Sequence, residues 1–381
     1  MKCMSRDDSR FNHVSGDHSV THVPPFAGTY QEMEGMRAWA NSNAGIPRGK
    51  IIGVRFPFRN FTVESINMLA SMGFTYDTSM SATGSEKVWP YTLDYGAATD
   101  CNGFISVCGK QLAAKGLWEI PMYTIEGADG LHLMDPFNDP SITNPNSPAT
   151  VFNDYKNTFD KHNQGDHVPF GVYMHPVWIG PGIPPSIPDG RAKAKAVSDF
   201  LDYAMSQPNV WMVTNAQLIA YMKNPVSASE IGSQPYMQCN LGPQNSICNG
   251  LGPDSLVETC NLPEGPLRTC YGCPDVTPSL QNPAPKKSGS KRCPVPDNCD
   301  MTWWDPIGCK CLCTSSSCAW TDESREIQLD GLKPGNGNAG NPKSKGTNST
   351  TGDSNNASFS NRAVAQSLII AGLLGLIIFL V

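Results

Sequence analysis

Crowded cysteines constrain the fold of this chain more than any other feature of its sequence. Eleven of the 14 cysteines lie between residues 239 and 318, while Cys3 stands alone and Cys101 and Cys108 form a close pair. Such crowding predicts a small disulfide-stapled module that forms in an oxidising compartment. A zinc site at Cys270-Tyr-Gly-Cys273 is the alternative, although neither a second CxxC nor paired histidines follow at zinc-finger spacing.

Residues from about 28 to 225 alternate between β-branched runs and amphipathic stretches. Strands are predicted over 50–58, 74–78, 117–125, 169–175 and 209–215. Helices are predicted over 62–73, 149–161, 191–206 and 216–223, with Thr62 as the cap of the first. Strands separated by helices indicate an α/β fold with a mostly parallel sheet, either doubly wound or closed into a barrel. In such folds the functional groups lie at the carboxyl ends of the strands.

Composition divides the chain into four segments. Residues 1–225 form the α/β domain, 226–320 the Cys-rich module, 321–362 a disordered Ser/Asn/Gly-rich stalk, and 363–381 an apolar tail. The tail follows small or polar residues around Asn356 and a short spacer, which is the pattern of a GPI attachment signal at that residue. A tail-anchored helix is the alternative. We therefore expect attachment to the outer face of the plasma membrane, or a place in the cell wall.

Several smaller features bear on location and partners. Asn60 and Asn348 begin N-glycosylation acceptor triplets. The net charge of −6 and the scattered basic residues argue against a nucleic-acid partner. Residues 1–13 hold no apolar segment that could serve as a signal peptide, although a GPI anchor requires the secretory pathway. We therefore expect the natural start of the protein to lie upstream of this sequence.

Three histidines and one arginine are candidate functional residues. His18 and His22 have helical i, i+4 spacing, so on a helix both would reach one metal ion; two histidines on a polar surface turn is the alternative. Arg55 ends a predicted strand, where its five donors suit a carboxylate unless the side chain lies in solvent. His175 also ends a predicted strand, and a structural role is its alternative.

The order of the motifs resembles a known family. The series is HSVTH at 18–22, RFPF at 55–58, GFTYDTS at 73–79, VWPYTLDY at 88–95, LWEIPMY at 117–123 and PFGVYMHPVW at 169–178. It resembles the polysaccharide deacetylases (carbohydrate esterase family 4, with the NodB-homology domain), and among them the chitin deacetylases. The resemblance implies a distorted (β/α) barrel that hydrolyses N-acetyl groups of chitin-type N-acetylglucosamine polymers.

The same resemblance implies residue roles. One divalent metal, usually zinc, is held by an aspartate and two histidines, which His18 and His22 match. Arg55 orients the aspartate that acts as general base, and the backbone N–H of Phe58 binds the oxyanion. His175 protonates the leaving amine, and Asp77 is the candidate for tuning it. Three aromatic side chains are candidates for the sugar or acetyl pocket, with core packing as the alternative: Trp89, Tyr91 and Trp118.

One departure from the family concerns the N-terminal region. The family begins with a strand whose Thr-Phe-Asp-Asp-type motif supplies the base and the third metal ligand. Only 17 residues precede His18, and Asp7-Asp8 is the sole acidic pair among them. We therefore expect an N-terminally incomplete barrel with weak metal binding and little or no activity. A non-catalytic glycan-binding surface protein and an esterase on another acetylated polysaccharide are the alternatives.

Overall fold

Helices and short strands alternate along most of the chain, which confirms the predicted mixed α/β fold. The computed structural model describes residues 16–22, 29–44, 49, 51–83, 86, 88–99, 112–127, 130–134, 148–165, 167–180, 190–237, 258–263, 265–269 and 271–289, with 304–305, 310–311 and 376–380. Asn348, Asn356, Cys101, Cys108 and the predicted stalk lie outside the described residues.

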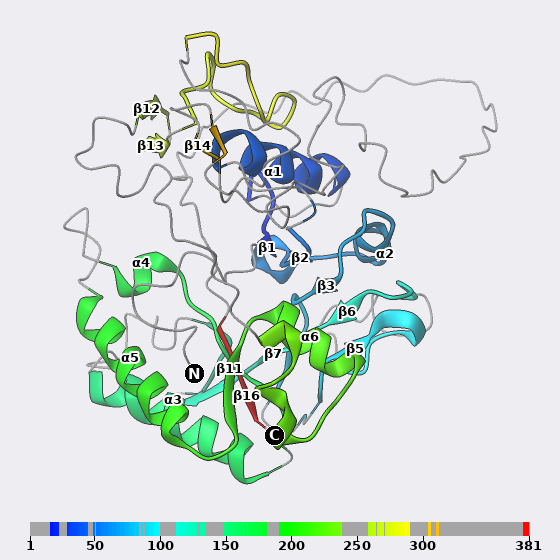
Figure 1. The fold of residues 1–381 in the computed structure, drawn as a ribbon, viewed down its shortest axis with the longest axis vertical. Helices are drawn as coiled ribbons and strands as arrows, with labels where there is room; N and C mark the ends of the chain where they lie inside the picture. The colour runs from blue at the N-terminus through cyan, green and yellow to red at the C-terminus, as the bar shows by residue number, and fades with distance from the viewer. Residues whose placement is uncertain are drawn as a thin grey trace.

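Four parallel strands and one antiparallel neighbour form the largest sheet, in the order β1-β2-β3-β6-β5 (Figure 1). The strands are β1 (Gly16–Asp17), β2 (Gly53–Val54), β3 (Tyr76–Asp77), β6 (Trp118–Glu119) and β5 (Tyr91–Thr92). The register aligns Asp17, Val54, Asp77 and Glu119. Because the strands that carry them are parallel, these residues form one row at the carboxyl edge of the sheet.

The remaining strands form smaller sheets. Strands β4 (Ser81–Ala82) and β7 (Met122–Tyr123) pair in parallel, and β8 (Ile125–Gly127) and β9 (Gly130–His132) form a hairpin. Strands β10 (Phe170–Val172) and β11 (Val210–Val213) flank β16 (Leu376–Leu380), which runs antiparallel to both and is drawn in red in Figure 1. No closed barrel is formed by the described strands, so the barrel stays a prediction.

The apolar tail contributes strand β16 through residues 376–380, and its predicted role as a lipid-anchor signal stays a prediction. Within the described residues, no helix has the length and apolar character needed to cross a membrane.

The helices that the periodicity predicts are present. They are α2 (Val63–Ser71), α3 (Pro148–Gln164), α5 (Arg191–Ser206) and α6 (Asn215–Lys223), joined by the short α4 (Pro176–Ile179) and α7 (Ala228–Ile231) and by 3-10 turns at Pro57–Arg59, Leu93–Tyr95 and Pro235–Met237. Thr62 caps α2 as predicted, in a reciprocal capping box with Ser65.

Helix α1 (Thr29–Ala44) was not predicted. Its face toward the protein carries charged side chains, because Glu32, Glu34 and Arg37 are only 5%, 3% and 2% exposed. Glu34 and Arg37 form an ion pair, and Arg37 also donates to the carbonyls of Ile51 and Met72. An amphipathic helix is recognised in a sequence by apolar residues that recur along its buried face. In α1, paired charged residues occupy part of that face, so this periodicity is missing.

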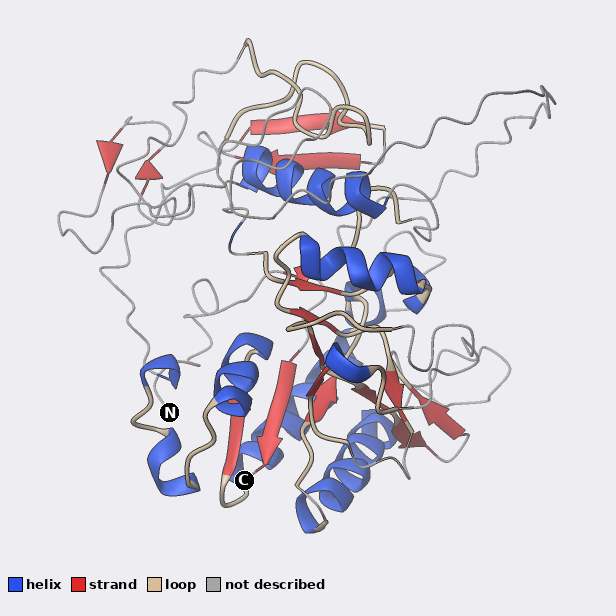
Figure 2. Cartoon of the chain, turned by 90° about the vertical axis from the view of Figure 1, so that its right-hand side faces the viewer, coloured by secondary structure: helices blue, strands red, loops and turns tan. Residues whose placement is uncertain are grey.

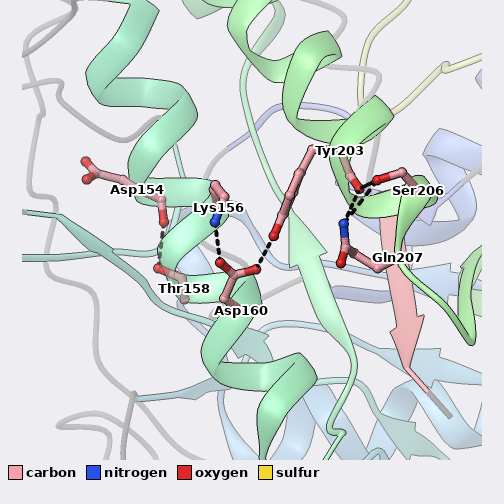
Figure 3. Close-up of polar contacts among 7 residues, drawn as sticks. All are labelled: Asp154, Lys156, Thr158, Asp160, Tyr203, Ser206 and Gln207. Atoms are coloured by element: carbon pink, nitrogen blue, oxygen red, sulfur yellow. Dashed lines mark hydrogen bonds and ion pairs between the residues drawn. The ribbon is translucent and has the colours of Figure 1, made fainter.

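Helices α3 and α5 pack side by side over an aromatic core. Tyr155 and Phe159 of α3 contact Phe200 of α5, with ring centroids 5.3 and 5.9 Å apart. Nearby, the Tyr203 hydroxyl donates to Asp160 Oδ1 at 2.8 Å, and Lys156 Nζ lies 2.5 Å from Asp160 Oδ2 (Figure 3). The buried rings contribute most of the stabilisation, at about 1.5–3 kcal/mol per side chain, whereas the partly exposed ion pair adds little.

One hairpin of the Cys-rich module lies beside α1 (Figure 2). Strands β12 (Glu258–Leu262) and β13 (Gly265–Thr269) form a hairpin, and a second pair joins β14 (Trp304–Asp305) to β15 (Lys310–Cys311). Cys260 and Cys273 form a disulfide, so the zinc alternative at the CxxC motif is wrong for Cys273. Thr269 Oγ1 donates to the carbonyl of Asn43 at 2.7 Å, which fastens the module to the end of α1.

Candidate functional site

His18 and His22 lie in a turn that follows β1 at the carboxyl edge of the large sheet. The predicted helix is wrong, because Ser19 and His22 have left-handed φ angles of 68° and 56°. Side chains bond the local backbone instead: Asp17 Oδ1 accepts from Ser19 N at 2.9 Å, and Ser19 Oγ accepts from His22 N at 3.0 Å. The turn still brings the two Nε2 atoms to within 3.1 Å of each other.

The orientation of His18 is set by a backbone carbonyl. His18 Nδ1 lies 2.6 Å from the carbonyl oxygen of Arg55, which can only accept, so Nδ1 carries the proton. The Nε2 lone pair is therefore directed at the Nε2 of His22. Metal-binding histidines are commonly held in this way by the other ring nitrogen. Two converging imidazole nitrogens fit a divalent cation between them.

Burial keeps both imidazoles in the metal-binding form. It lowers the pKa of His18 to about 4 and also lowers the pKa of His22, so both rings are neutral near pH 7. Within the described residues, however, no group of three or more His, Cys, Asp or Glu side chains is arranged to hold a metal ion. The pair thus forms a partial ligand set.

Arg55 is buried at 5% exposure, so the solvent alternative is wrong. Its Nε donates to the carbonyl of Thr78 and its Nη2 to the Thr78 hydroxyl, each at 3.0 Å. The guanidinium carbon lies 4.6 Å from the centroid of the Tyr173 ring. Its Nη1 has no hydrogen-bond partner in the described part of the chain. A buried donor of this kind suits an anionic group.

Asp77 and Glu119 form a buried acid pair beside Arg55. Asp77 accepts from the backbone N–H and hydroxyl of Ser79 at 2.9 and 2.8 Å, and Glu119 accepts from Met80 N at 3.1 Å. Burial raises the pKa of both carboxyls, and the charge of Asp77 raises the pKa of Glu119 further. The sequence analysis missed Glu119, although it stands in the quoted WEIPM motif. The role of Asp77 toward His175 stays a prediction.

His175 and Phe58 lie near the histidine pair. His175 is the N-cap residue of α4, and its positive charge would lower the pKa values of both His18 and His22. The ring of Phe58 is 66% exposed, and its centroid lies 4.9 Å from that of the His22 ring. Phe58 has a left-handed φ of 55°. His175 and Phe58 therefore lie close to His18 and His22 in the structure.

The three predicted pocket aromatics are half-buried and pack against core clusters. Trp89 packs against Tyr123, and Trp118 packs in the cluster that contains Tyr76. The Tyr91 hydroxyl lies 3.2 Å from Thr99 Oγ1. This packing favours the core alternative, and the pocket roles stay predictions. Asn60 is half-buried directly after the turn that holds Phe58, and its glycosylation also stays a prediction.

Glu32 of α1 is a further site residue that the sequence analysis missed. Its carboxylate accepts hydrogen bonds from residues 20 and 21, within the turn that carries both histidines. Glu32 lies in α1, a helix that was not predicted, so no sequence signal identified it as a site residue.

Comparisons with known proteins agree with the motif series. No family model matches the chain. The chain is 28% identical to chitin deacetylase 8 of Bombyx mori over 280 residues, which is 70% of this chain and 69% of that protein. It is 25% identical to chitin deacetylase 1 of Bombyx mori over 311 residues, which is 73% of this chain and 53% of that protein.

Proposed function

Because its two chitin deacetylase relatives support a chitin deacetylase-like polysaccharide deacetylase family for this chain, we propose that it hydrolyses N-acetyl groups of chitin-type N-acetylglucosamine polymers. The observation that carries this proposal is the convergence of His18 and His22, with Nε2 atoms 3.1 Å apart, beside His175 and a buried Arg55. Amide hydrolysis needs an activated water and a proton for the amine, and these residue types supply both.

We propose that His18 and His22 hold one divalent metal, with zinc as the expected ion. When bound, such an ion supplies Lewis-acid polarisation of the acetamide carbonyl and a lowered pKa of water. The chain itself contributes the rest. The Arg55 carbonyl keeps His18 in the tautomer whose Nε2 is free, and the Phe58 N–H stabilises the developing oxyanion. His175 gives a proton to the departing amine, and the Nη1 donor of Arg55 would orient the aspartate that the family uses as base.

A zinc and acetate assay of the full chain tests this proposal. Because the two imidazoles form a partial ligand set, we expect the chain to bind one zinc ion weakly and to release acetate from chitin oligomers slowly. A double variant, His18→Ala with His22→Ala, should abolish zinc binding at this site and acetate release, because it removes both proposed ligands. His175→Ala should keep zinc binding but slow acetate release by about 100-fold or more.

The matched control is His167→Asn, because His167 is an exposed histidine with φ 53°, a backbone conformation that asparagine tolerates. It should match the wild type in both assays. Acetate release that survives the loss of His18 and His22 would contradict the proposal. Acetate release from acetylxylan but not from chitin would show that the substrate is another acetylated polysaccharide.

The partial ligand set favours one alternative, a glycan-binding surface protein without catalysis. Chitin sedimentation separates the two: binding without acetate release, in zinc-loaded protein, supports the alternative.

The location of the protein is a further part of the proposal. We propose a GPI anchor attached at Asn356 and glycans at Asn60 and Asn348, because the apolar tail and the acceptor triplets fit these modifications. Release of the protein from cells by a phosphatidylinositol-specific phospholipase would support the anchor.

A further inference from the structure

One buried carboxylate makes three hydrogen bonds to the turn that carries both histidines. Glu32 Oε2 accepts from Val20 N at 2.9 Å and from Thr21 N at 3.0 Å, and Glu32 Oε1 accepts from the Thr21 hydroxyl at 2.6 Å. Val20 and Thr21 are the two residues between Ser19 and His22. The carboxylate therefore holds the part of the turn that determines how His22 is placed relative to His18.

Helix α1 packs directly against this turn. A Cβ added at Gly35, one helical turn after Glu32, would come within 2.9 Å of Val20 Cγ2. The turn also contains two non-glycine residues with left-handed φ angles, Ser19 and His22. Such backbone costs free energy and persists only when surrounding contacts enforce it. Bonds from Glu32 to both intervening backbone amides are contacts of this kind.

We propose that Glu32 is a positioning residue for the metal site, acting through the His18–His22 turn. This inference rests on the proposed function, because it takes the two imidazoles as metal ligands. His18 is separately oriented by the Arg55 carbonyl at 2.6 Å, so the Glu32 bonds act mainly on His22. Partners that orient metal ligands in this way typically affect metal affinity by about 10–100-fold.

The test compares three substitutions in the full chain. Glu32→Leu removes all three hydrogen bonds. Glu32→Gln keeps them, because the amide oxygen accepts from both N–H groups and the amide nitrogen donates to the Thr21 hydroxyl. Thr21→Val removes the hydroxyl bond to Glu32 at a solvent-exposed residue, so we expect this variant to fold even if Glu32→Leu does not.

The first measurement needs no metal. Exchange of the Val20 and Thr21 amide hydrogens, followed by NMR, should be about tenfold faster in Glu32→Leu and unchanged in Glu32→Gln. Equal exchange in wild type and Glu32→Leu would overturn the inference whatever the metal affinity proves to be.

The second measurement is zinc affinity by competition with a chromophoric chelator. Glu32→Leu should lose about 10–100-fold, Thr21→Val a smaller factor, and Glu32→Gln almost none. Lys287→Met is the stability control, because Lys287 Nζ donates to the carbonyl of Ser42 at the far end of α1. It should lower Tm without changing zinc affinity.

The outcomes separate the two ideas. Unchanged zinc affinity in Glu32→Leu, or an equal loss in Lys287→Met, would overturn the positioning role and leave the metal site intact. A wild type that binds no zinc, but whose amide exchange still depends on Glu32, would overturn the proposed function and the positioning role, and leave only a structural bond.

Discussion

Asp77 and Glu119 are neighbouring buried carboxyls with raised pKa values. Both are fully buried and occupy the same row of neighbouring parallel strands. Burial raises the pKa of each group, and the charge of Asp77 raises the pKa of Glu119 further. The positive charge of Arg55 acts in the opposite direction on both groups.

The substitution Glu119→Gln tests the raised pKa of Glu119. The folded wild type keeps a proton that the unfolded chain releases above the ordinary glutamate pKa of 4.5. The contribution of a raised pKa is thus present at low pH and is lost as pH rises. Glutamine does not titrate, yet it still accepts from Met80 N and donates to Asp77. The stability of the variant relative to wild type should rise by up to about 1.4 kcal/mol per pH unit from pH 4.5 to 7.

Urea unfolding at several pH values measures this difference. A difference in stability between the two proteins that is constant with pH would show that the pKa of Glu119 is not raised in the folded protein.

At the scale of an element, local side-chain contacts determine where helix α2 begins. Thr62 and Ser65 cap its start reciprocally: Thr62 Oγ1 accepts from Ser65 N at 3.1 Å, and Ser65 Oγ accepts from Thr62 N at 2.8 Å. The buried Ile66 and Leu69 then direct one face of the helix into the core. The helix begins shortly after the Pro57–Arg59 turn that contains Phe58.

Thr62→Ala should destabilise the folded protein by about 1 kcal/mol, because it leaves an N-terminal N–H of α2 without its acceptor. Thr62→Ser keeps the acceptor and is the matched control, with little expected loss. Protein made without glycosylation is required, since Thr62 also belongs to the Asn60 acceptor triplet. Equal unfolding midpoints for the two variants in urea would argue against the cap.

At the scale of the whole molecule, the hairpin of the Cys-rich module and the α/β domain are joined through α1. Thr269 and Lys287 donate to backbone carbonyls at the end of that helix, and its other end holds the histidine turn through Glu32. Helix α1 thus connects the disulfide-linked hairpin to the candidate metal site. The disulfide between Cys260 and Cys273 closes a loop of 13 residues and limits the freedom of the unfolded module.

Replacing Cys260 and Cys273 by serine should destabilise the module by about 2–4 kcal/mol. Hydrogen exchange followed by mass spectrometry should then show faster exchange in β12, β13 and the end of α1. Peptides from α3 and α5 serve as the internal control, because these helices pack on an aromatic core of their own. Faster exchange throughout the chain, or none in the hairpin, would contradict this local role.

The sequence by itself determined those elements whose signals are local. The bounds of α5 and the cap of α2 follow from periodicity and capping, which act within a few residues. The predicted strand end at His175 is wrong, because β10 ends at Val172 and His175 is the N-cap residue of α4. Motif order also indicated the family that the chitin deacetylase relatives support.

Only the tertiary structure decided the rest. The histidine pair converges through a left-handed turn and not a helix, because Glu32 and the Arg55 carbonyl bond that turn from other parts of the chain. Glu119 meets Asp77 through strand register, and Cys273 pairs with Cys260 across a hairpin turn. Buried charges and disulfides depend on partners that are distant in sequence, and no local pattern encodes those partners.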